Sequence, residues 1–430
     1  MALTNYIDNF FKISQNNSTI KTELLSGLST FLSMSYIIFV NPIILSNAGM
    51  DSGSVFVATI LISAFATILM GLYANMPLAL APGMGTNSWF VYGIVMTMGY
   101  NWQLALGGVF LSGILMLIFS VTPLRQSIIN SLSDSFKMAM TSGVGLFIAL
   151  IGFKTAGIFV PNTNTFASLG NFTSTPIILT LLSLIVIFIC ESFKVKGSVL
   201  IAIILTSIIS LVIGITNFSG IVSSIPSIQP TFMQLDIKNA FNVGMLSLVF
   251  TLFVIDYFDS TSLLGASSNM IGKKDSKQFK KALIVDSGAT SLGSLLGVST
   301  TTAYSESIVG INQGGRTGLV SVVVGLLFVS MLFFSPLLSV MPSFVGSAVM
   351  IYVGSLMFYS LKKVNWEDIT EVIPTFIMII TIPLTFSIFN GIGLAMLTWI
   401  ILKIIFKKWQ KDYMYTLLIA IIFLLFNIFK

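Results

Sequence analysis

The sequence contains no histidine, and Cys190 is the single cysteine among its 430 residues. One cysteine cannot form an internal disulfide, a cysteine zinc site or an iron–sulfur cluster. Without histidine, histidine-ligated metals and haem are excluded, and proton chemistry has to use carboxylates. No nucleophile motif is recognisable either. We therefore expect a protein without a metal or a cofactor, and the residues give little support to a membrane enzyme.

Charge is also scarce, because charged residues make up 8% of the chain and hydrophobic residues 55%, with a mean hydropathy of +0.97. A soluble domain carries about 25% charged residues. Apolar runs of about 18–25 residues recur along the whole length, which is the size needed to cross about 30 Å of hydrocarbon. The composition predicts an all-α polytopic membrane protein embedded in a lipid bilayer.

Apolar windows predict fourteen transmembrane segments, divided into two sets of seven by the polar stretch 217–241. The first set is 22–43, 54–73, 77–96, 102–121, 136–158, 175–191 and 197–216. The second set is 242–264, 282–297, 298–311, 318–340, 343–361, 371–388 and 390–406. An extra hydrophobic C-terminal segment, 413–430, either spans the membrane or lies at its interface.

The N-terminal segment 1–21 lacks the basic start, apolar core and cleavage site of a signal peptide. With this segment in the cytoplasm, eighteen of the 21 basic residues fall on the inside, as the positive-inside rule requires. The inside set includes "KKDSKQFKK" (273–281) and the cluster Lys403, Lys407, Lys408 and Lys411. We expect a multi-pass protein of the plasma (inner) membrane. The net charge of +6 is scattered over segment ends and predicts no nucleic-acid partner.

Because each set contains an odd number of spans, two similar halves would insert with opposite topology, as in many secondary transporters. The third span of each set is interrupted, by "LALAPGMGTNSWF" (78–90) and by "GVSTTTAYSES" (297–307). Pro costs a helix about 3 kcal/mol and Gly about 1 kcal/mol relative to Ala. Unpaired backbone cannot face lipid, so both stretches should line protein or a cavity. The alternative is that their small residues only permit close helix packing.

Apart from those at span ends, such as Glu23 and Glu191, four acidic residues lie within predicted spans: Asp256, Asp259, Asp286 and Glu306. A carboxylate at the bilayer centre costs about 2.5–3.5 kcal/mol, which marks it as a functional candidate. Asp256 and Asp259 are three residues apart, share a helix face and have no basic residue nearby in sequence. Two close carboxylates suit a site that gains and loses a proton. Alternatively, they belong to a structural network that caps a broken helix or bonds a hydroxyl.

The interrupted spans contribute further candidates. Glu306 could accept hydrogen bonds from ring N–H or amine groups, and Asn87 offers both a donor and an acceptor. Phe90, Phe258 and Tyr304 are the nearest aromatic residues and could stack on a flat ligand, although packing in the core would explain them equally well. Asp286 follows Lys281 by only five residues, so it could simply lie near the cytoplasmic interface.

Five motifs together closely resemble the AzgA-like purine permeases, the adenine/guanine/hypoxanthine branch of the nucleobase:cation symporters, which are related to the xanthine and uracil permeases. They are "GLSTFLSMSYIIFVNP" (27–42), "LALAPGMGTNSWF", "VIDYFDSTSLLG" (254–265), "STTTAYSESIVG" (299–310) and "GGRTGL" (314–319). The resemblance runs in order from about residue 22 to 406. It does not include 413–429.

The resemblance implies two inverted seven-span repeats. A core domain would comprise 22–121 and 242–340 (spans 1–4 and 8–11), and a gate domain 136–216 and 343–406 (spans 5–7 and 12–14). Substrate would lie between short antiparallel strands in the broken spans 3 and 10. Uracil permeases often carry a histidine in span 8, and this chain has none.

Residue by residue, the resemblance makes Asp256 a purine-binding residue and places the family's second acid at Asp259 and its span-9 aspartate at Asp286. The substrate-binding set that we expect is Asp256, Glu306, Asn87, Ser305 and Phe90, with Asp259 and Asp286 in proton coupling. The leading interpretation is a secondary active transporter that imports purine nucleobases (adenine, guanine, hypoxanthine) by proton symport with alternating access.

Other interpretations use the same fold for xanthine, uracil or an inorganic anion, or couple transport to Na⁺. An anion carrier should place positive charge at the site, and the four acids argue against that. A channel is another alternative, but buried acids beside broken helices suit alternating access better. The sequence leaves open which purine is preferred, which acid carries the proton, and whether the chain forms a homodimer.

Overall fold

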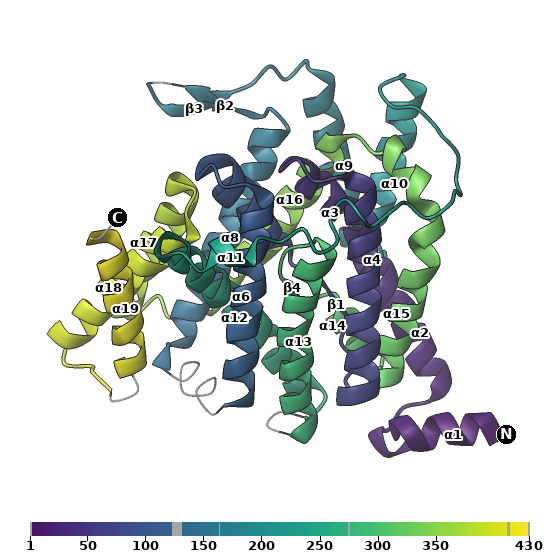
Figure 1. Ribbon diagram of the computed structural model, residues 1–430, viewed down its shortest axis with the longest axis horizontal. Helices are drawn as coiled ribbons and strands as arrows, with labels where there is room; N and C mark the ends of the chain where they lie inside the picture. Colours follow the sequence, from purple (N-terminus) through teal and green to yellow (C-terminus); the bar gives the residue numbers. More distant parts are fainter. Residues whose placement is uncertain (1, 123–130, 163, 274–275, 411–412, 429–430) are drawn as a thin grey trace.

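Long α-helices account for most of the computed structural model, which describes residues 2–122, 131–162, 164–273, 276–410 and 413–428 (Figure 1). Within these ranges, nine helices are long and apolar enough to cross a membrane. Two further apolar helices, Ser198–Val212 and Ile369–Thr385, are shorter. Fewer continuous helices than the fourteen predicted spans are found because several of those spans are interrupted.

The helices follow the predicted windows closely. In the first half they are α1 (Ala2–Phe11), α2 (Ile20–Met34), α3 (Ile37–Ser46), α4 (Ser52–Leu69), α5 (Met84–Ser88), α6 (Trp102–Val121), α8 (Asp134–Thr155), α9 (Thr175–Ser192) and α10 (Ser198–Val212). In the second half they are α11 (Ile237–Ala240), α12 (Val243–Met270), α13 (Lys277–Leu296), α14 (Ser307–Asn312), α15 (Gly318–Ser330), α16 (Ser343–Phe358), α17 (Ile369–Thr385), α18 (Ile388–Ile405) and α19 (Tyr413–Ile428).

Several helices begin where a polar side chain caps free backbone N–H groups. Asp51 accepts from the N–H of Ser54 at 2.8 Å and starts α4. Asn101 accepts from the N–H of Leu104 at 2.8 Å and starts α6. Such caps satisfy donors that have no partner inside the helix, and each contributes about 1 kcal/mol. They explain why helices in this apolar chain begin at isolated polar residues.

The predicted first span is divided, because α2 ends at Met34 and α3 begins at Ile37. Other spans change helix type at one end. The end of α4 continues as a π-helical segment, Met70–Ala74, and the end of α15 as a 3-10 segment, Met331–Val340, which contains Pro336. Proline lacks a backbone N–H and disrupts the regular α-helical bonding. These irregular segments shape the bundle around its broken spans.

The helices pack in two sets, defined by which helices touch. In the first set, α15 packs on α2 and α4, and α6 packs on α12 and α13. In the second set, α16 packs on α8 and α9, α17 on α8 and α18, and α19 on α18. Glycine permits the closest approaches, since a Cβ atom at Gly354 of α16 would collide with the carbonyl oxygen of Gly145 of α8. Small residues bring membrane helices together in this way.

Two short strands from distant parts of the chain pair in the interior. β1 (Leu80–Pro82) runs antiparallel to β4 (Thr301–Ala303), with Ala81 opposite Thr302. Backbone bonds extend the ladder at both ends, from Gly83 N to Thr300 O at 2.9 Å and from Tyr304 N to Ala79 O at 2.9 Å. The predicted strands in the two interrupted spans are therefore confirmed, and they satisfy backbone groups that a membrane interior would leave unpaired.

A second strand pair, formed by neighbouring strands, lies at the opposite end of the molecule from α1 (Figure 1). It joins β2 (Phe159–Asn162) and β3 (Phe166–Leu169), which pair antiparallel with Phe159 opposite Leu169. The N-terminal helix and this strand pair therefore mark the two ends of the bundle.

Candidate functional site

Asp256 reaches the strand pair through a threonine. The hydroxyl of Thr290 on α13 lies 2.8 Å from Oδ2 of Asp256 and 3.0 Å from the carbonyl oxygen of Thr301. The same hydroxyl accepts from the N–H of Thr301 at 3.2 Å. Asp256 is 1% exposed, and Thr290 is fully buried. The carboxylate thus helps to fix β4 from one side.

Asp286 holds the same strand further along. Its Oδ1 accepts from the N–H of Ala303, the last residue of β4, at 3.2 Å. The side chain is fully buried in the protein. On α12, the hydroxyl of Ser260 lies 2.7 Å from that of Thr302. Two acids and two hydroxyls thus surround a three-residue strand.

Glu306 follows β4 and stands directly before α14. Its Oε1 accepts from the hydroxyl of Tyr36 at 2.7 Å, and its Oε2 accepts from the hydroxyl of Ser305 at 3.0 Å. Tyr36 lies between α2 and α3, and Ser305 is exposed. The break between α2 and α3 therefore delivers a hydrogen-bond donor to the carboxylate that stands between β4 and α14.

Asn87, on α5, uses both ends of its amide inside the protein. Its Nδ2 donates to Oδ1 of Asn41 at 2.5 Å, and Nδ2 of Asn41 donates to Thr59 at 2.7 Å. Oδ1 of Asn87 accepts from the hydroxyl of Ser299. All four side chains are fully buried. In this conformation Asn87 ties α5 to α3 and to the segment before β4.

Asp259 faces a narrow cavity between the two sets of helices. The cavity is small, with a volume of about 20 Å³, which is room for about one water molecule. Asp259 contributes the one carboxylate among the described residues that line it. The full lining is Gly85 and Thr86 of α5, Met140, Thr141 and Val144 of α8, Ile255 and Asp259 of α12, and Met357 of α16. The carboxylate of Asp259, on α12 of the first set, thus faces largely apolar side chains of α8 and α16 in the second set.

The aromatic candidates are placed differently from one another. Phe90 is fully buried and does not line this cavity. Phe258 packs edge-on against Tyr257, with ring centres 5.0 Å apart. Tyr304 donates its hydroxyl to the carbonyl oxygen of Pro82 at 2.6 Å and so links β4 to β1. For Phe90 and Phe258, the packing interpretation agrees with these positions.

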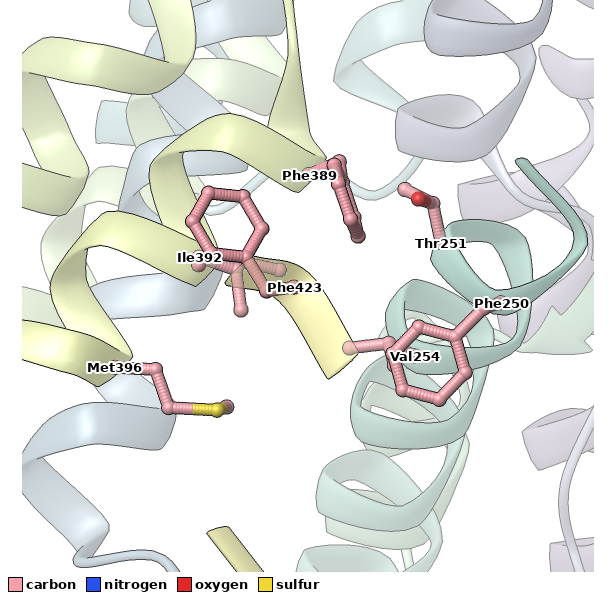
Figure 2. Close-up of a pocket in the computed structure, with 8 residues that line it drawn as sticks. Phe250, Thr251, Val254, Phe389, Ile392, Met396 and Phe423 are labelled. Atoms are coloured by element: carbon pink, nitrogen blue, oxygen red, sulfur yellow. The ribbon is translucent and has the colours of Figure 1, made fainter. Parts of the chain in front are cut away.

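A second cavity is lined almost entirely by apolar side chains (Figure 2). Phe250, Thr251 and Val254 of α12 face residues of α18 and Phe423 of α19 across it; the α18 residues are Phe389, Ile392, Gly393 and Met396. Ligand sites usually combine an apolar wall with a few convergent polar groups. This cavity offers a single hydroxyl, so it suits hydrocarbon better than a hydrogen-bonding ligand.

Several residues at the site were not found from the sequence. Thr290 stands one turn after Asp286 on the same helix face, a spacing that could have identified it. Tyr36 lies within a motif of the resemblance but had no assigned role. Met140, Val144 and Met357 gave no signal, because apolar side chains in a span are unremarkable. Among the described residues, no three His, Cys, Asp or Glu side chains form a group that could hold a metal ion.

Comparisons with known sequences point to one family. The profile of the xanthine/uracil permeases, described as the Permease family, matches residues 21–394. A putative permease of Methanocaldococcus jannaschii is 45% identical over 98% of each chain. An adenine permease of Escherichia coli is 39% identical over 98% of this chain and 96% of its own. A guanine/hypoxanthine permease of Bacillus subtilis is 38% identical over 98% of this chain and 99% of its own.

Solved structures agree on the fold at low sequence identity. The transmembrane domain of a cyanobacterial bicarbonate transporter superposes with a TM-score of 0.62 at 14% identity, over 93% of this chain and 97% of that one. A murine solute carrier 26 anion transporter in the inward-facing state gives a TM-score of 0.66 at 13% identity, over 94% and 72%. The chain therefore shares a transporter fold with proteins whose sequences differ widely from its own.

Proposed function

This chain belongs to the Permease family, and we propose that it imports purine nucleobases together with protons. Relatives with 34–45% identity over nearly the whole chain include adenine and guanine/hypoxanthine permeases. It is a multi-pass membrane transporter rather than an enzyme. The observation that carries the proposal is Asp259, a carboxylate exposed to a cavity between two sets of helices.

The base would bind against the β1–β4 pair, near Asp256, which reaches β4 through Thr290, and Glu306, which follows β4. Each carboxylate now accepts a hydroxyl donor, from Thr290 and from Tyr36. The N–H edge of a purine offers donors of the same kind and could replace them at little net cost, because hydrogen bonds would be exchanged rather than lost. Asn87 and Ser305 would complete the polar contacts, and Phe90 would support the site from the packed interior.

Asp259 is the better placed of the two coupling candidates. It faces the open cavity, whereas Asp286 is buried behind β4. A group that exchanges protons with water needs a path to water. We assign proton uptake to Asp259 and the positioning of β4 to Asp286, with the strand transmitting the effect to the base.

Alternating access would use the two helix sets as moving parts. The first set, 22–121 with 242–340, is the proposed core domain and carries the acids. The second set, 136–216 with 343–406, is the proposed gate domain and provides Met140 and Met357. Two inverted repeats are related by a two-fold axis in the membrane plane, so corresponding segments run in opposite directions where they meet. The antiparallel β1–β4 pair supports this arrangement.

The charge of the cavity distinguishes this proposal from anion transport by the structural neighbours, a bicarbonate transporter and a solute carrier 26 anion transporter. Among the described residues that line it, one is acidic and none is basic. A carboxylate in a site of low dielectric repels anions strongly. A base with N–H donors meets no such repulsion.

The test is uptake of radiolabelled adenine, guanine, hypoxanthine, xanthine and uracil in cells that lack their own nucleobase carriers. Assays would include a protonophore and a Na⁺-free buffer. The variants are Asp256→Asn, Asp259→Asn and Glu306→Gln. The matched control is Asp134→Asn, which removes a carboxylate that is 91% exposed.

We expect purine uptake that collapses with the proton gradient, persists without Na⁺ and is lost in all three site variants but not in the control. Purine uptake that persists in both Asp256→Asn and Glu306→Gln would contradict the binding assignment. Uptake that follows Na⁺ instead of protons would contradict the coupling, and preferential uptake of xanthine or uracil would contradict the substrate.

A further inference from the structure

The N-terminal helix α1 is attached to the bundle by one half of its apolar surface. Phe11 is 6% exposed and, with Ile7 and Ile13, packs against Leu319 and its neighbours on α15. The amide of Asn75 donates to the carbonyl oxygen of Phe11 at 2.8 Å. Beyond the helix, Asp8 accepts from the N–H of Ser14 at 2.8 Å and closes the turn. These contacts fix how the helix is rotated about its own axis.

The other half of the apolar surface has no protein against it in the described part of the chain. Tyr6 and Phe10 are 68% and 50% exposed, and their rings stack with centres 6.5 Å apart. At about 100° per residue, these two positions adjoin Ile7 and Phe11 on the helix surface. The polar residues occupy the opposite face: Thr4, Asn5, Asp8 and Asn9. One continuous apolar arc is therefore half covered by α15 and half bare.

The direction of α1 suggests what covers the bare half. The helix lies across the direction of the long helices, beyond the end of α2, and extends away from the bundle (Figure 1). Since helices such as α4 cross the membrane, a helix that lies across their direction runs along the membrane surface. At the same end, α2 exposes Leu24, Leu25 and Leu28, which continue the apolar surface into the bilayer.

We propose that α1 lies in the interface of the bilayer, with Tyr6 and Phe10 inserted among the lipid chains just below the headgroups. An amphipathic helix of this kind buries its apolar face about 5–10 Å into the headgroup and acyl boundary. Exposed Lys12 and Lys21 flank the site and would attract anionic headgroups. A ten-residue helix is marginal alone, so α15 holds it from one side and lipid from the other.

The test uses spin labels on the full chain in nanodiscs of phosphatidylcholine and phosphatidylglycerol. On a Cys190→Ser background, cysteine would replace Tyr6 or Phe10, and the matched controls Asn5→Cys and Asn9→Cys would label the polar face. For each label, the measured quantity is the ratio of its collision rate with oxygen to its collision rate with a water-soluble nickel chelate. We expect this ratio to be several-fold higher at positions 6 and 10 than at positions 5 and 9. Equal nickel access at all four positions would overturn the proposal. So would shielding of positions 6 and 10 from both reagents, which is the result expected if a second copy of the chain covers them.

A second measurement avoids the labels. The double change Tyr6→Ser with Phe10→Ser should make trypsin cleave after Lys12 several-fold faster in nanodiscs, because α1 loses its hold on the bilayer. Asn5→Ser with Asn9→Ser alters the polar face and should leave the rate unchanged. Cleavage at the same rate in both double variants would contradict insertion.

Discussion

Glu371 and Lys403 form an ion pair in which neither side chain is more than 7% exposed. Nζ of Lys403 lies 2.7 Å from Oε1 of Glu371. The same oxygen accepts from the indole N–H of Trp399 at 3.1 Å, and Oε2 accepts from Ser133 at 2.6 Å. Lys403 also donates to Thr370 at 2.8 Å. The sequence placed Lys403 in a basic cluster on the cytoplasmic side, and the structure adds that this member of the cluster is buried.

Removing one partner of this pair should be costly. Glu371→Gln removes the nearer counter-charge of the buried Lys403 ammonium and leaves Asp368, whose Oδ2 lies 3.9 Å away. We expect the free energy of unfolding to fall by about 3 kcal/mol, the lower end of the range for breaking a buried pair. Thermal unfolding in detergent measures this loss of stability. Asp134→Asn breaks an exposed pair with Lys137 and should cost no more than about 1 kcal/mol. Equal losses in the two variants would contradict the prediction, whereas Glu371→Leu combined with Lys403→Met should recover most of the loss.

Asp368, outside the membrane at the start of α17, should make stability depend on pH. Partial burial opposes its ionisation, but hydrogen bonds from Lys408 and Thr370 outweigh that effect and hold its pKa at about 2. Because the pKa is lower in the folded state, the stabilisation is complete above the unfolded pKa of about 3.9. It is lost as pH falls through about 2, and at neutral pH it is at most about 2 kcal/mol.

The prediction concerns the difference in unfolding free energy between the unmodified chain and Asp368→Asn. This difference should be constant above about pH 5 and should shrink between about pH 4 and 2. Glu367→Gln removes an exposed charge one residue earlier and controls for net charge. A difference that does not change over this range would show that Asp368 has no special role.

At the scale of elements, α19 depends on a glycine of α18. A Cβ atom at Gly393 would overlap the ring of Phe423, which also packs on Phe389 with ring centres 4.9 Å apart. At the other end of α19, Tyr413 packs on Trp399 at 4.6 Å. The extra C-terminal segment is therefore an integral helix of the second set.

We expect Gly393→Ala to lower the free energy of unfolding by about 1–3 kcal/mol, the usual cost of overpacking. In a Phe423→Ala background the same change should cost much less, because the obstructing ring is gone. Gly288→Ala on α13, where a Cβ would meet nothing within 4 Å, should be neutral or stabilising. Melting curves of these variants measure the coupling, and equal effects of Gly393→Ala in both backgrounds would disprove the contact.

The elements best predicted from the sequence are those governed by local chemistry. The window 102–121 matches α6, and the Gly, Pro and Thr residues of 78–90 and 297–307 correctly indicated breaks in two helices, where the family resemblance implied the short strands. The break at Tyr36 was missed because no proline or glycine marks it. The pairing of Glu371 with Lys403 was missed because their contact depends on how α17 folds back on α18, which no local pattern contains.

For the whole molecule, the proposed mechanism requires the two sets of helices to move against each other. They meet where a Cβ atom at Gly85 of α5 would lie 3.0 Å from Cγ1 of Val144 on α8. Linking these positions through cysteines with a bifunctional thiol reagent, on a Cys190→Ser background, should abolish uptake. Uptake should return when the link is reduced.

Single-cysteine variants treated with the same reagent control for blocking of the cavity and should retain most activity. Mass spectrometry would establish the fraction linked. Full uptake by linked protein would contradict alternating access by relative motion of the two sets.

The β1–β4 pair also sets an order of events during synthesis. Tyr304 follows Pro82 by 222 residues, so at about 5–20 residues per second a ribosome needs roughly 10–45 s to make the second strand after the first. Throughout that time the backbone of 80–82 has no partner strand, although it belongs to a segment inserted in the bilayer. The nascent chain must therefore keep its third span in a wet or protein-lined place until the tenth arrives. In a chain truncated before residue 301, the segment that contains 80–82 never gains its partner strand and remains a substrate for membrane quality-control proteases.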